Sequence, residues 1–450
     1  MPHCAIAAQT TGHAALHLIT ARTLSFIDDP GIVGEERSYE FHEKGAIVVD
    51  DDGSIAWSGS AVDLPAEHRD LPSTGYGDKI VMAGFVDAHL HFPQYRMIAA
   101  FGKDLLDWLN RYTFIEEQRY ADAGFARQAA AKFLDELVRN GITSCLAFST
   151  IHPVALDALF EEALQRGMAL VSGKTMMDCN APKGLSDTAE TGYRESKELI
   201  AKWHGVGRLQ YAITPRFAVT SSEAQLEATG VLKREHPDLI LQTHLSENDA
   251  EIAAVANSFP WSKDYTDVYD HYGLLSEKAF FAHGIHLSER ELARMSEAGA
   301  SVVHCPTSNN FLGSGLFRYH HTREAGRPVS IGVGSDVGGG TNHSTLATLR
   351  DAYVVSQLVG SRITAFDAFY LATLGNSRLM HLDHEIGSLA PGRTADLVVL
   401  DPEATPIMAE RHALSNSLHD ELFALMIMGD DRAVAETYIA GKPVKSALAR

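Results

Sequence analysis

The chain has 450 residues, of which 45% are hydrophobic and 21% are charged, as is ordinary for a globular enzyme. Its formal net charge of -20 argues against a nucleic-acid partner, because an acidic surface repels phosphates. No uninterrupted apolar run reaches the ~18 residues that a membrane-spanning helix needs, so we expect no membrane partner.

The cysteines and the N-terminal sequence point to a compartment. Cys4, Cys145, Cys179 and Cys305 are too few and too scattered for a disulfide framework or a CxxC metal site. The N-terminal sequence lacks the charged stretch and apolar core of a secretory signal. We therefore expect a cytoplasmic protein with reduced thiols.

The predicted elements alternate between strands and helices along most of the chain. Residues 45–57 predict two strands around an Asp-Asp-Gly turn. Helix-like stretches follow at 122–140, with Gly141 as the stop, and at 288–298, and residues 387–400 predict a late turn and strand. Eight short apolar runs of strand character lie at residues 80–91, 141–148, 168–176, 209–216, 239–244, 279–283, 301–304 and 329–336.

These runs predict a barrel. They are nearly continuous in apolar residues rather than alternating, which suits parallel strands covered on both faces. Repeated alternation of strand and helix favours right-handed βαβ units, and eight such units favour a closed (β/α)8 barrel of the TIM type. An open doubly wound sheet is the alternative fold.

Polar residues lie where the predicted strands end, which is the end of a barrel where active sites are built. His89 and His91 point the same way, because side chains on a strand repeat every two residues. His244 and Asp336 can complete a metal site from other strands and leave one position for water. One buried histidine alone is more often a hydrogen-bonded core residue, but the combination predicts a divalent metal ion. Zinc fits nitrogen and oxygen ligands best, and iron or manganese can occupy similar sites.

Two carboxylates near this site can move protons. Glu247 follows His244 by three residues and can reach back into the same pocket. Zinc lowers the pKa of its water to about 7, and Asp336 can take the proton of the attacking water. Asp87 lies on the same strand as His89, and we interpret it as a structural carboxylate rather than a metal ligand.

The motifs resemble a known superfamily. Residues 81–91, Val-Met-Ala-Gly-Phe-Val-Asp-Ala-His-Leu-His, followed by Gln94, resemble the first-strand signature of the amidohydrolase superfamily. Other segments, in this order and at these separations, resemble the guanine deaminase family: Thr214-Pro-Arg-Phe217, His244-Leu-Ser-Glu247, Ala282-His-Gly284, His304-Cys-Pro306 and Gly334-Ser-Asp-Val-Gly-Gly339. The resemblance runs from about residue 45 to about residue 400.

The resemblance implies a reaction and a substrate, a small purine base. It implies hydrolytic deamination of guanine to xanthine and ammonia by hydroxide that a metal makes available. Related mononuclear enzymes have a histidine at the position of His283, which either binds the metal or contacts its water. The run 209–216 has no lysine to bridge two metals, so one metal per subunit is expected. The residues that the resemblance assigns to substrate binding are Gln94, Arg216, Phe217, His244, Glu247 and Asp336, and those assigned to catalysis are Glu247, Asp336 and His283.

The resemblance also implies an organisation. The flanks of such barrels pair into one small β-sandwich, which predicts domains at residues 1–80, 81–384 and 385–450, the first and last forming the sandwich. Residues 103–114 resemble the family's covering element after the first strand, and ordinary helix packing or a contact in a homodimer are alternatives for that segment.

Two other functions stay open at this point. One is a different aminohydrolase of the superfamily, acting on cytosine, a triazine or an adenosine-like nucleoside. The other is a metal-binding scaffold without catalysis, which the pair of Glu247 and Asp336 disfavours, because a scaffold needs no proton-transfer groups.

Overall fold

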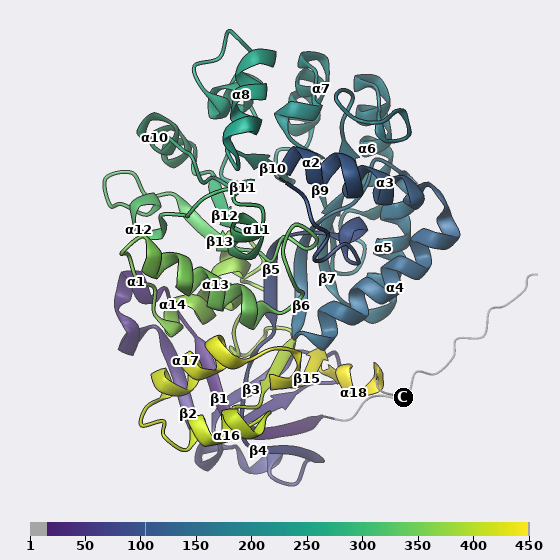
Figure 1. Cartoon of the computed structure of the whole chain (residues 1–450). Coiled ribbons are helices and arrows are strands. Elements are labelled where there is room, and N and C mark those ends of the chain that lie inside the picture. Colours follow the sequence, from purple (N-terminus) through teal and green to yellow (C-terminus); the bar gives the residue numbers. More distant parts are fainter. Residues whose placement is uncertain (1–15, 104, 449–450) are drawn as a thin grey trace, which may run out of the picture.

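The computed structural model describes residues 16–103 and 105–448, and Cys4 and the N-terminal sequence considered above lie outside them. The chain forms two sheets, a nine-stranded parallel sheet surrounded by helices and a seven-stranded sheet built from the two flanks (Figure 1). The parallel sheet carries the residues that the sequence singled out.

The parallel sheet is a (β/α)8 barrel, as predicted. Its strands pair in parallel in chain order, and short β8 (Thr175–Met176) pairs with β9. Beyond β13, the Asp336 N–H donates to the His89 carbonyl at 2.8 Å and the His91 N–H to the Val337 carbonyl at 2.6 Å, so the last strand meets the first. The alternative of an open sheet is therefore wrong. The eight barrel strands are β5 Phe85–His91, β6 Ile142–Phe148, β7 Ala169–Gly173, β9 Leu209–Pro215, β10 Ile240–Leu245, β11 Ala279–His283, β12 Ser301–His304 and β13 Ser330–Val333.

Helices cover the outside of the barrel (Figure 1). The two predicted helices are confirmed: Asp122 caps α4, and Ser288 caps α10 in a reciprocal capping box with Glu291. Gly141 has a φ of 78°, which suits a glycine just after a helix end. The longer helices are α4 Ala123–Arg139, α5 Pro153–Arg166, α6 Ala189–Trp203, α7 Glu223–Glu235, α8 Asp249–Ser258, α9 Tyr265–His271, α10 Glu289–Ala298, α13 Thr345–Leu358 and α17 Leu418–Met428.

Shorter helical segments fill the connections. They are α1 Pro30–Val33, α2 Leu105–Trp108, α3 Phe114–Glu117, α11 Pro306–Phe311, α12 Tyr319–Thr322, α14 Ala365–Tyr370, α15 Asn376–Leu379, α16 Pro406–His412 and α18 Lys445–Leu448. A π-helical turn, Leu109–Thr113, joins α2 to α3.

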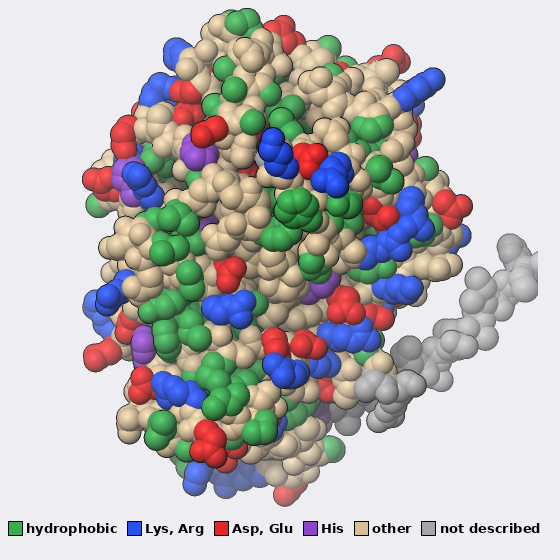
Figure 2. Space-filling model, in the orientation of Figure 1, with side chains coloured by type: hydrophobic (Ala, Val, Ile, Leu, Met, Phe, Trp, Pro, Cys, Tyr) green, Lys and Arg blue, Asp and Glu red, His purple; other side chains and the backbone are tan. Residues whose placement is uncertain are grey.

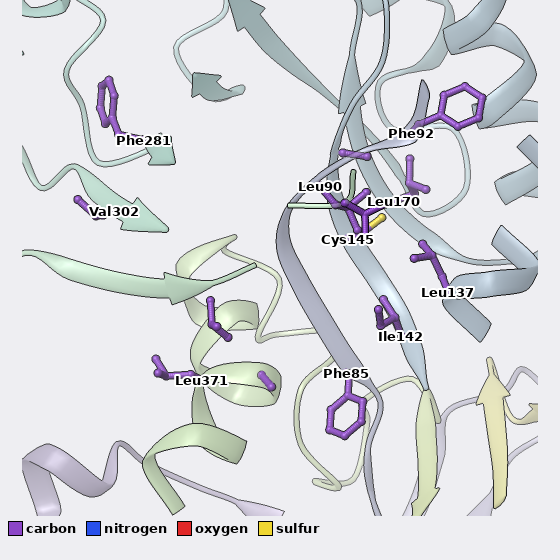
Figure 3. Close-up of a cluster of buried hydrophobic side chains, with 14 of the residues drawn as sticks. Phe85, Leu90, Phe92, Leu137, Ile142, Cys145, Leu170, Phe281, Val302 and Leu371 are labelled. Carbon is purple, nitrogen blue, oxygen red and sulfur yellow. The ribbon is translucent and has the colours of Figure 1, made fainter. Parts of the chain in front are cut away.

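Side chains alternate between the barrel interior and the helical layer. Val171 and Val303 belong to an interior cluster, whereas their neighbours Leu170 and Val302 belong to the layer between strands and helices. Figure 3 shows part of that outer layer, in which strand residues such as Cys145 and Ile142 lie near Leu137 of α4. Apolar packing on both faces of the strands thus supports the polar residues at the strand ends.

The flanking sheet unites the two ends of the chain. β4 (Ser73–Ala83) pairs antiparallel with β14 (Leu397–Leu400), from Ile80 opposite Leu400 to Ala83 opposite Leu397. This flanking sheet, in which the two ends of the chain meet as expected, has a hydrophobic cluster of its own. The division at 80/81 and 384/385 stays a prediction, and β4 runs across the first of these points. The other strands of this sheet are β1 His17–Phe26, β2 Tyr39–Val49, β3 Ile55–Ser60, β15 Val434–Ile439 and β16 Lys442–Pro443.

The extents of three predicted strands are wrong. The run 80–91 forms two strands, because Gly84 breaks it where a side chain would have its Cβ 2.2 Å from Thr143 Oγ1. The run 168–176 is interrupted at Lys174, whose ammonium turns to Asp187. The last strand ends at Val333, so Asp336 lies three residues beyond it.

The surface carries mixed charges. Acidic, basic and hydrophobic side chains are interspersed over the face shown in Figure 2. Within the described part of the chain, every helix is too short or too polar to cross a membrane. Cys145, Cys179 and Cys305 are all free thiols.

Candidate active site and metal centre

Five buried polar side chains meet at the carboxyl ends of the barrel strands. His89 and His91 lie at the end of β5, and their Nε2 atoms lie 3.3 and 3.2 Å from Oδ1 of Asp336. His91 Nε2 also lies 3.2 Å from His244 Nε2, which comes from β10. One possible ligand atom from each of His89, His244, His283 and Asp336 falls within 4.8 Å of the others. The structure thus brings the predicted metal ligands together, with His283 of β11 among them.

The histidines of this cluster fit a divalent metal ion. Nε2 of His89 and of His283 is buried without a hydrogen-bond partner among the described residues. His244 Nδ1 lies 2.7 Å from the Arg216 carbonyl oxygen, which can only accept, so Nδ1 carries the proton and Nε2 keeps its lone pair. Burial lowers the pKa of His91 to about 3, and burial with the neighbouring imidazoles holds the pKa of His244 well below its usual range. Neutral imidazoles are the form that binds metals.

Asp336 supplies the negative charge. Burial alone would raise its pKa, but the adjacent imidazoles of His89 and His91 outweigh burial and hold the pKa of Asp336 well below its usual range. The carboxylate is therefore ionised at neutral pH, as a ligand must be. Imidazole nitrogens and one carboxylate together form a donor set for zinc and similar divalent ions.

Asp87 holds backbone instead of joining the cluster. Its Oδ1 accepts from the N–H groups of His89 and Ser335, each at 3.1 Å. These two bonds tie β5, which carries His89, to the segment after β13, which carries Asp336. The structural interpretation of Asp87 agrees with this geometry.

His283 lies between the metal cluster and Glu247. Its Nε2 is 3.8 Å from Asp336 Oδ2 and 3.4 Å from Glu247 Oε2, while Nδ1 is 2.8 Å from Asn309 Oδ1. His283 and Asp336 both have left-handed backbones, with φ of 72° and 50°, a strained state that is concentrated at functional sites. This position suits either role expected for His283, a metal ligand or a contact to water.

Glu247 is a buried carboxyl group that can hold a proton. Its Oε1 accepts a hydrogen bond from Ser314 Oγ at 3.0 Å. Burial, with the nearby charge of Asp336, raises the pKa of Glu247 to about 8. A group that titrates near neutral pH is suited to both giving and taking a proton.

A cavity adjoins the metal cluster, and its empty space is about 370 Å³ when the solvent at its mouth is included. Its lining contains every residue that the sequence predicted for substrate binding, namely Gln94, Arg216, Phe217, His244, Glu247 and Asp336. Polar groups at one end and an aromatic ring beside them suit a flat ligand with several edge acceptors.

The segment predicted as a covering element lines the same cavity. Leu105 and Trp108 of α2 and Leu109 of the π-helical turn contribute apolar walls. Helical structure continues through α3 to Glu117, three residues beyond the predicted segment. The segment therefore forms part of the cavity wall, and its role as a cover stays a prediction.

Three polar residues that support the site were not identified from the sequence. Asn309 and Ser314 bond the proposed catalytic residues His283 and Glu247. Glu117 is fully buried and accepts hydrogen bonds from both Gln94 and Arg216. Nothing in the local sequence distinguishes Glu117 from its neighbour Glu116, and the other two lie in a connection with no periodic pattern.

Comparisons with known proteins agree with this site. Residues 80–444 match the Amidohydrolase family. The chain is 46% identical over 422 residues to guanine deaminase of Escherichia coli (strain K12), covering 93% of this chain and 94% of the relative.

Solved structures are similar over nearly the whole chain. The structure of the E. coli guanine deaminase has a TM-score of 0.90 at 44% identity and covers 95% of this chain and 99% of its own. A C. acetobutylicum guanine deaminase with guanine bound in its active site has a TM-score of 0.85 at 28% identity and covers 95% and 100%. The chain therefore belongs to the amidohydrolase family and, within it, to the guanine deaminases.

Proposed function

We propose that this chain catalyses the hydrolytic deamination of guanine to xanthine and ammonia, as part of purine breakdown or salvage. The observation that carries the proposal is one cavity whose lining combines Glu247, His283 and Asp336 with Gln94, Arg216 and Phe217. Its relatives named guanine deaminase support the choice of substrate, among them one solved with guanine bound.

Arg216 and Gln94 orient the base. Both hydrogen bonds that the Arg216 side chain makes to described residues come from Nη1, so Nε and Nη2 remain to donate to the O6 and ring-nitrogen acceptors of guanine. The ring of Phe217 adds an apolar wall. A planar guanidinium suits a planar base, because its donors lie in one fixed plane.

Glu247 and Asp336 move the protons. Asp336 accepts one proton of the attacking water, and Glu247 gives its own proton to the ring nitrogen beside C2. Glu247 then takes the remaining proton of the new C2 hydroxyl group and passes it to the departing amine, and the proton held by Asp336 restores Glu247 to its protonated form. Atoms balance, because water adds at C2 and ammonia leaves. The raised pKa of Glu247 supports this double role, since the group is protonated in part at neutral pH.

A divalent metal would be held by His89, His91, His244 and Asp336, with His283 as a further ligand or a contact to water. We propose zinc, with iron or manganese as alternatives, and one ion per subunit. When bound, such an ion makes hydroxide available near neutral pH and stabilises charge that develops at the attacked carbon.

We also propose a homodimer in the cytoplasm. Phe101 and Ile115 flank the covering segment and are 70% and 60% exposed, which favours a second copy covering them. The free thiols of the described cysteines suit a reducing compartment. Light scattering of the purified protein tests the dimer.

The substrate is tested by ammonia release from guanine, adenine and cytosine at matched concentrations, with metal-loaded protein. We expect guanine to be turned over with a kcat/KM at least 100-fold above the others. Preferred turnover of adenine or cytosine would point to a different aminohydrolase. No turnover of any base would favour a scaffold without catalysis.

A further inference from the structure

A single buried carboxylate joins the two proposed base-binding residues. Glu117 Oε1 accepts from Gln94 Nε2 at 2.8 Å and from Arg216 Nη1 at 2.9 Å, and Oε2 accepts from the same Nη1 at 2.9 Å. Glu117 is 0% exposed and Arg216 is 3% exposed. Both residues are buried, so each charge depends on the other for compensation.

We propose that Glu117 is a positioning residue that fixes Gln94 and Arg216 for a neutral base and makes the closed covering segment part of the binding site. This inference rests on the proposed function. Gln94 follows β5 and Arg216 follows β9, whereas Glu117 ends α3. The contacts therefore connect two barrel strands to the segment that covers the cavity.

The first consequence is the orientation of the Gln94 amide. Nε2 donates to Glu117, and Oε1 lies 3.4 Å from the Gly338 N–H. If the Gln94 amide were flipped, its Oε1 would face the Glu117 carboxylate, acceptor against acceptor. Its NH2 group would face the Gly338 N–H, donor against donor. The order of donor and acceptor that Gln94 presents to the base is thus set from outside the cavity.

The second consequence is the charge of the pocket. Arg216 alone would make this end of the cavity cationic and would favour anions. With Glu117 beside it, the pair is neutral overall, while Nε and Nη2 still donate. The arrangement selects hydrogen-bond pattern rather than charge, which suits guanine, a neutral base.

Glu116 provides a matched control. It is the preceding residue on the same short helix, but its carboxylate bonds Arg96 and Arg119, whose side chains are 43% and 46% exposed. Glu116→Gln makes the same chemical change away from the cavity. We expect it to leave guanine turnover and ligand binding unchanged.

The test compares wild type, Glu116→Gln, Glu117→Gln and Glu117→Asp. In Glu117→Gln, we expect kcat/KM for guanine to fall at least tenfold at unchanged metal content. Calorimetry with two unreactive purines measures the binding affinity for urate, which is anionic at neutral pH, relative to that for hypoxanthine, which is neutral. Loss of packing would weaken both affinities alike and leave their ratio unchanged. Losing the carboxylate leaves Arg216 uncompensated, so binding of urate relative to hypoxanthine should strengthen about tenfold.

Glu117→Asp separates charge from reach. It keeps the charge but shortens the side chain, so we expect wild-type preference between urate and hypoxanthine with a loss of about tenfold in kcat/KM. If Glu117→Gln does not fold, this variant carries the test: unchanged kcat/KM, or a shifted preference, would overturn the proposal. For a folded Glu117→Gln, an unchanged preference would overturn it.

Failure of the proposed function would look different. Wild type and Glu116→Gln would then fail to turn over guanine, whereas the binding preferences, which need no turnover, would still report on Glu117.

Discussion

His244 Nδ1 donates to the carbonyl oxygen of Arg216 at 2.7 Å, so a proposed metal ligand and a proposed base-binding residue share one hydrogen bond. The bond fixes the ring of His244 and also the backbone from which the Arg216 side chain projects. The metal ligand His244 and the base-binding residue Arg216 are therefore held at a fixed position relative to each other. Attack at one defined ring carbon requires such a fixed arrangement.

Removal of a metal ligand should lower metal content and activity together. We expect His89→Ala to lose most of its metal, because the remaining ligands no longer complete the site. Metal analysis alongside ammonia release measures both. Full occupancy in this variant would count against His89 as a ligand, and two tightly bound ions per wild-type subunit would contradict a mononuclear site.

Glu247→Gln should keep the metal and lose turnover. The amide keeps the size of the side chain and a hydrogen bond to Ser314 but cannot transfer the proton. General acid-base groups contribute about 10² to 10⁴ in rate, and Glu247 serves two steps, so the loss in kcat should reach about 10⁴ or more. Asp249→Asn, which changes an exposed carboxylate two residues away, serves as the control. Activity within tenfold of wild type would require another proton carrier.

Arg216→Met should impair both binding and stability. Losing a charged hydrogen bond costs about 1.5 to 3 kcal/mol, or roughly 10- to 200-fold in kcat/KM for guanine. The buried Glu117 is left uncompensated as well, which should lower the free energy of unfolding by about 3 kcal/mol.

Arg216→Lys separates these effects. It should restore part of the stability through its charge but not the full kcat/KM, because an ammonium lacks the planar fork. Kinetics and denaturant titration, with metal content measured in parallel, give both quantities. Wild-type efficiency in Arg216→Met would remove Arg216 from the base-binding site.

A partly buried ion pair joins the flanking sheet to the barrel. Arg208 Nη2, just before β9, lies 2.6 Å from Oδ2 of Asp396, just before β14. Asp396→Asn should lower the free energy of unfolding by about 3 kcal/mol, the low end for a broken buried pair, because Arg208 also pairs with Glu385.

An exposed pair offers the comparison for this change. Asp430→Asn breaks a surface contact with Arg432 and should cost less than about 1 kcal/mol. Equal effects of the two substitutions in denaturant titrations would show that the buried pair does not hold the two sheets together.

Much of the fold follows from local pattern, and the departures have physical causes. Continuous apolar runs identify strands such as β6 and β11. The same pattern cannot show where the chain leaves one sheet and enters another, as it does at Gly84. There the decisive fact is the close approach of Thr143, a contact between residues far apart in sequence.

The site divides in the same way. The spacing of His89 and His91 predicts their role from the sequence, and the position of Arg216 at a strand end predicts its role. Glu117 does not, because its role depends on how a covering helix packs over the barrel. Long-range packing also decides that Asp336 projects from a left-handed turn beyond β13 rather than from the strand itself.

Reaction in ¹⁸O-labelled water tests hydrolysis of guanine at C2 most directly. Metal-loaded protein should convert guanine to xanthine that carries one labelled oxygen, with one ammonia released per xanthine, and metal-depleted protein should form neither. Absence of xanthine, or xanthine without the label, would contradict the account.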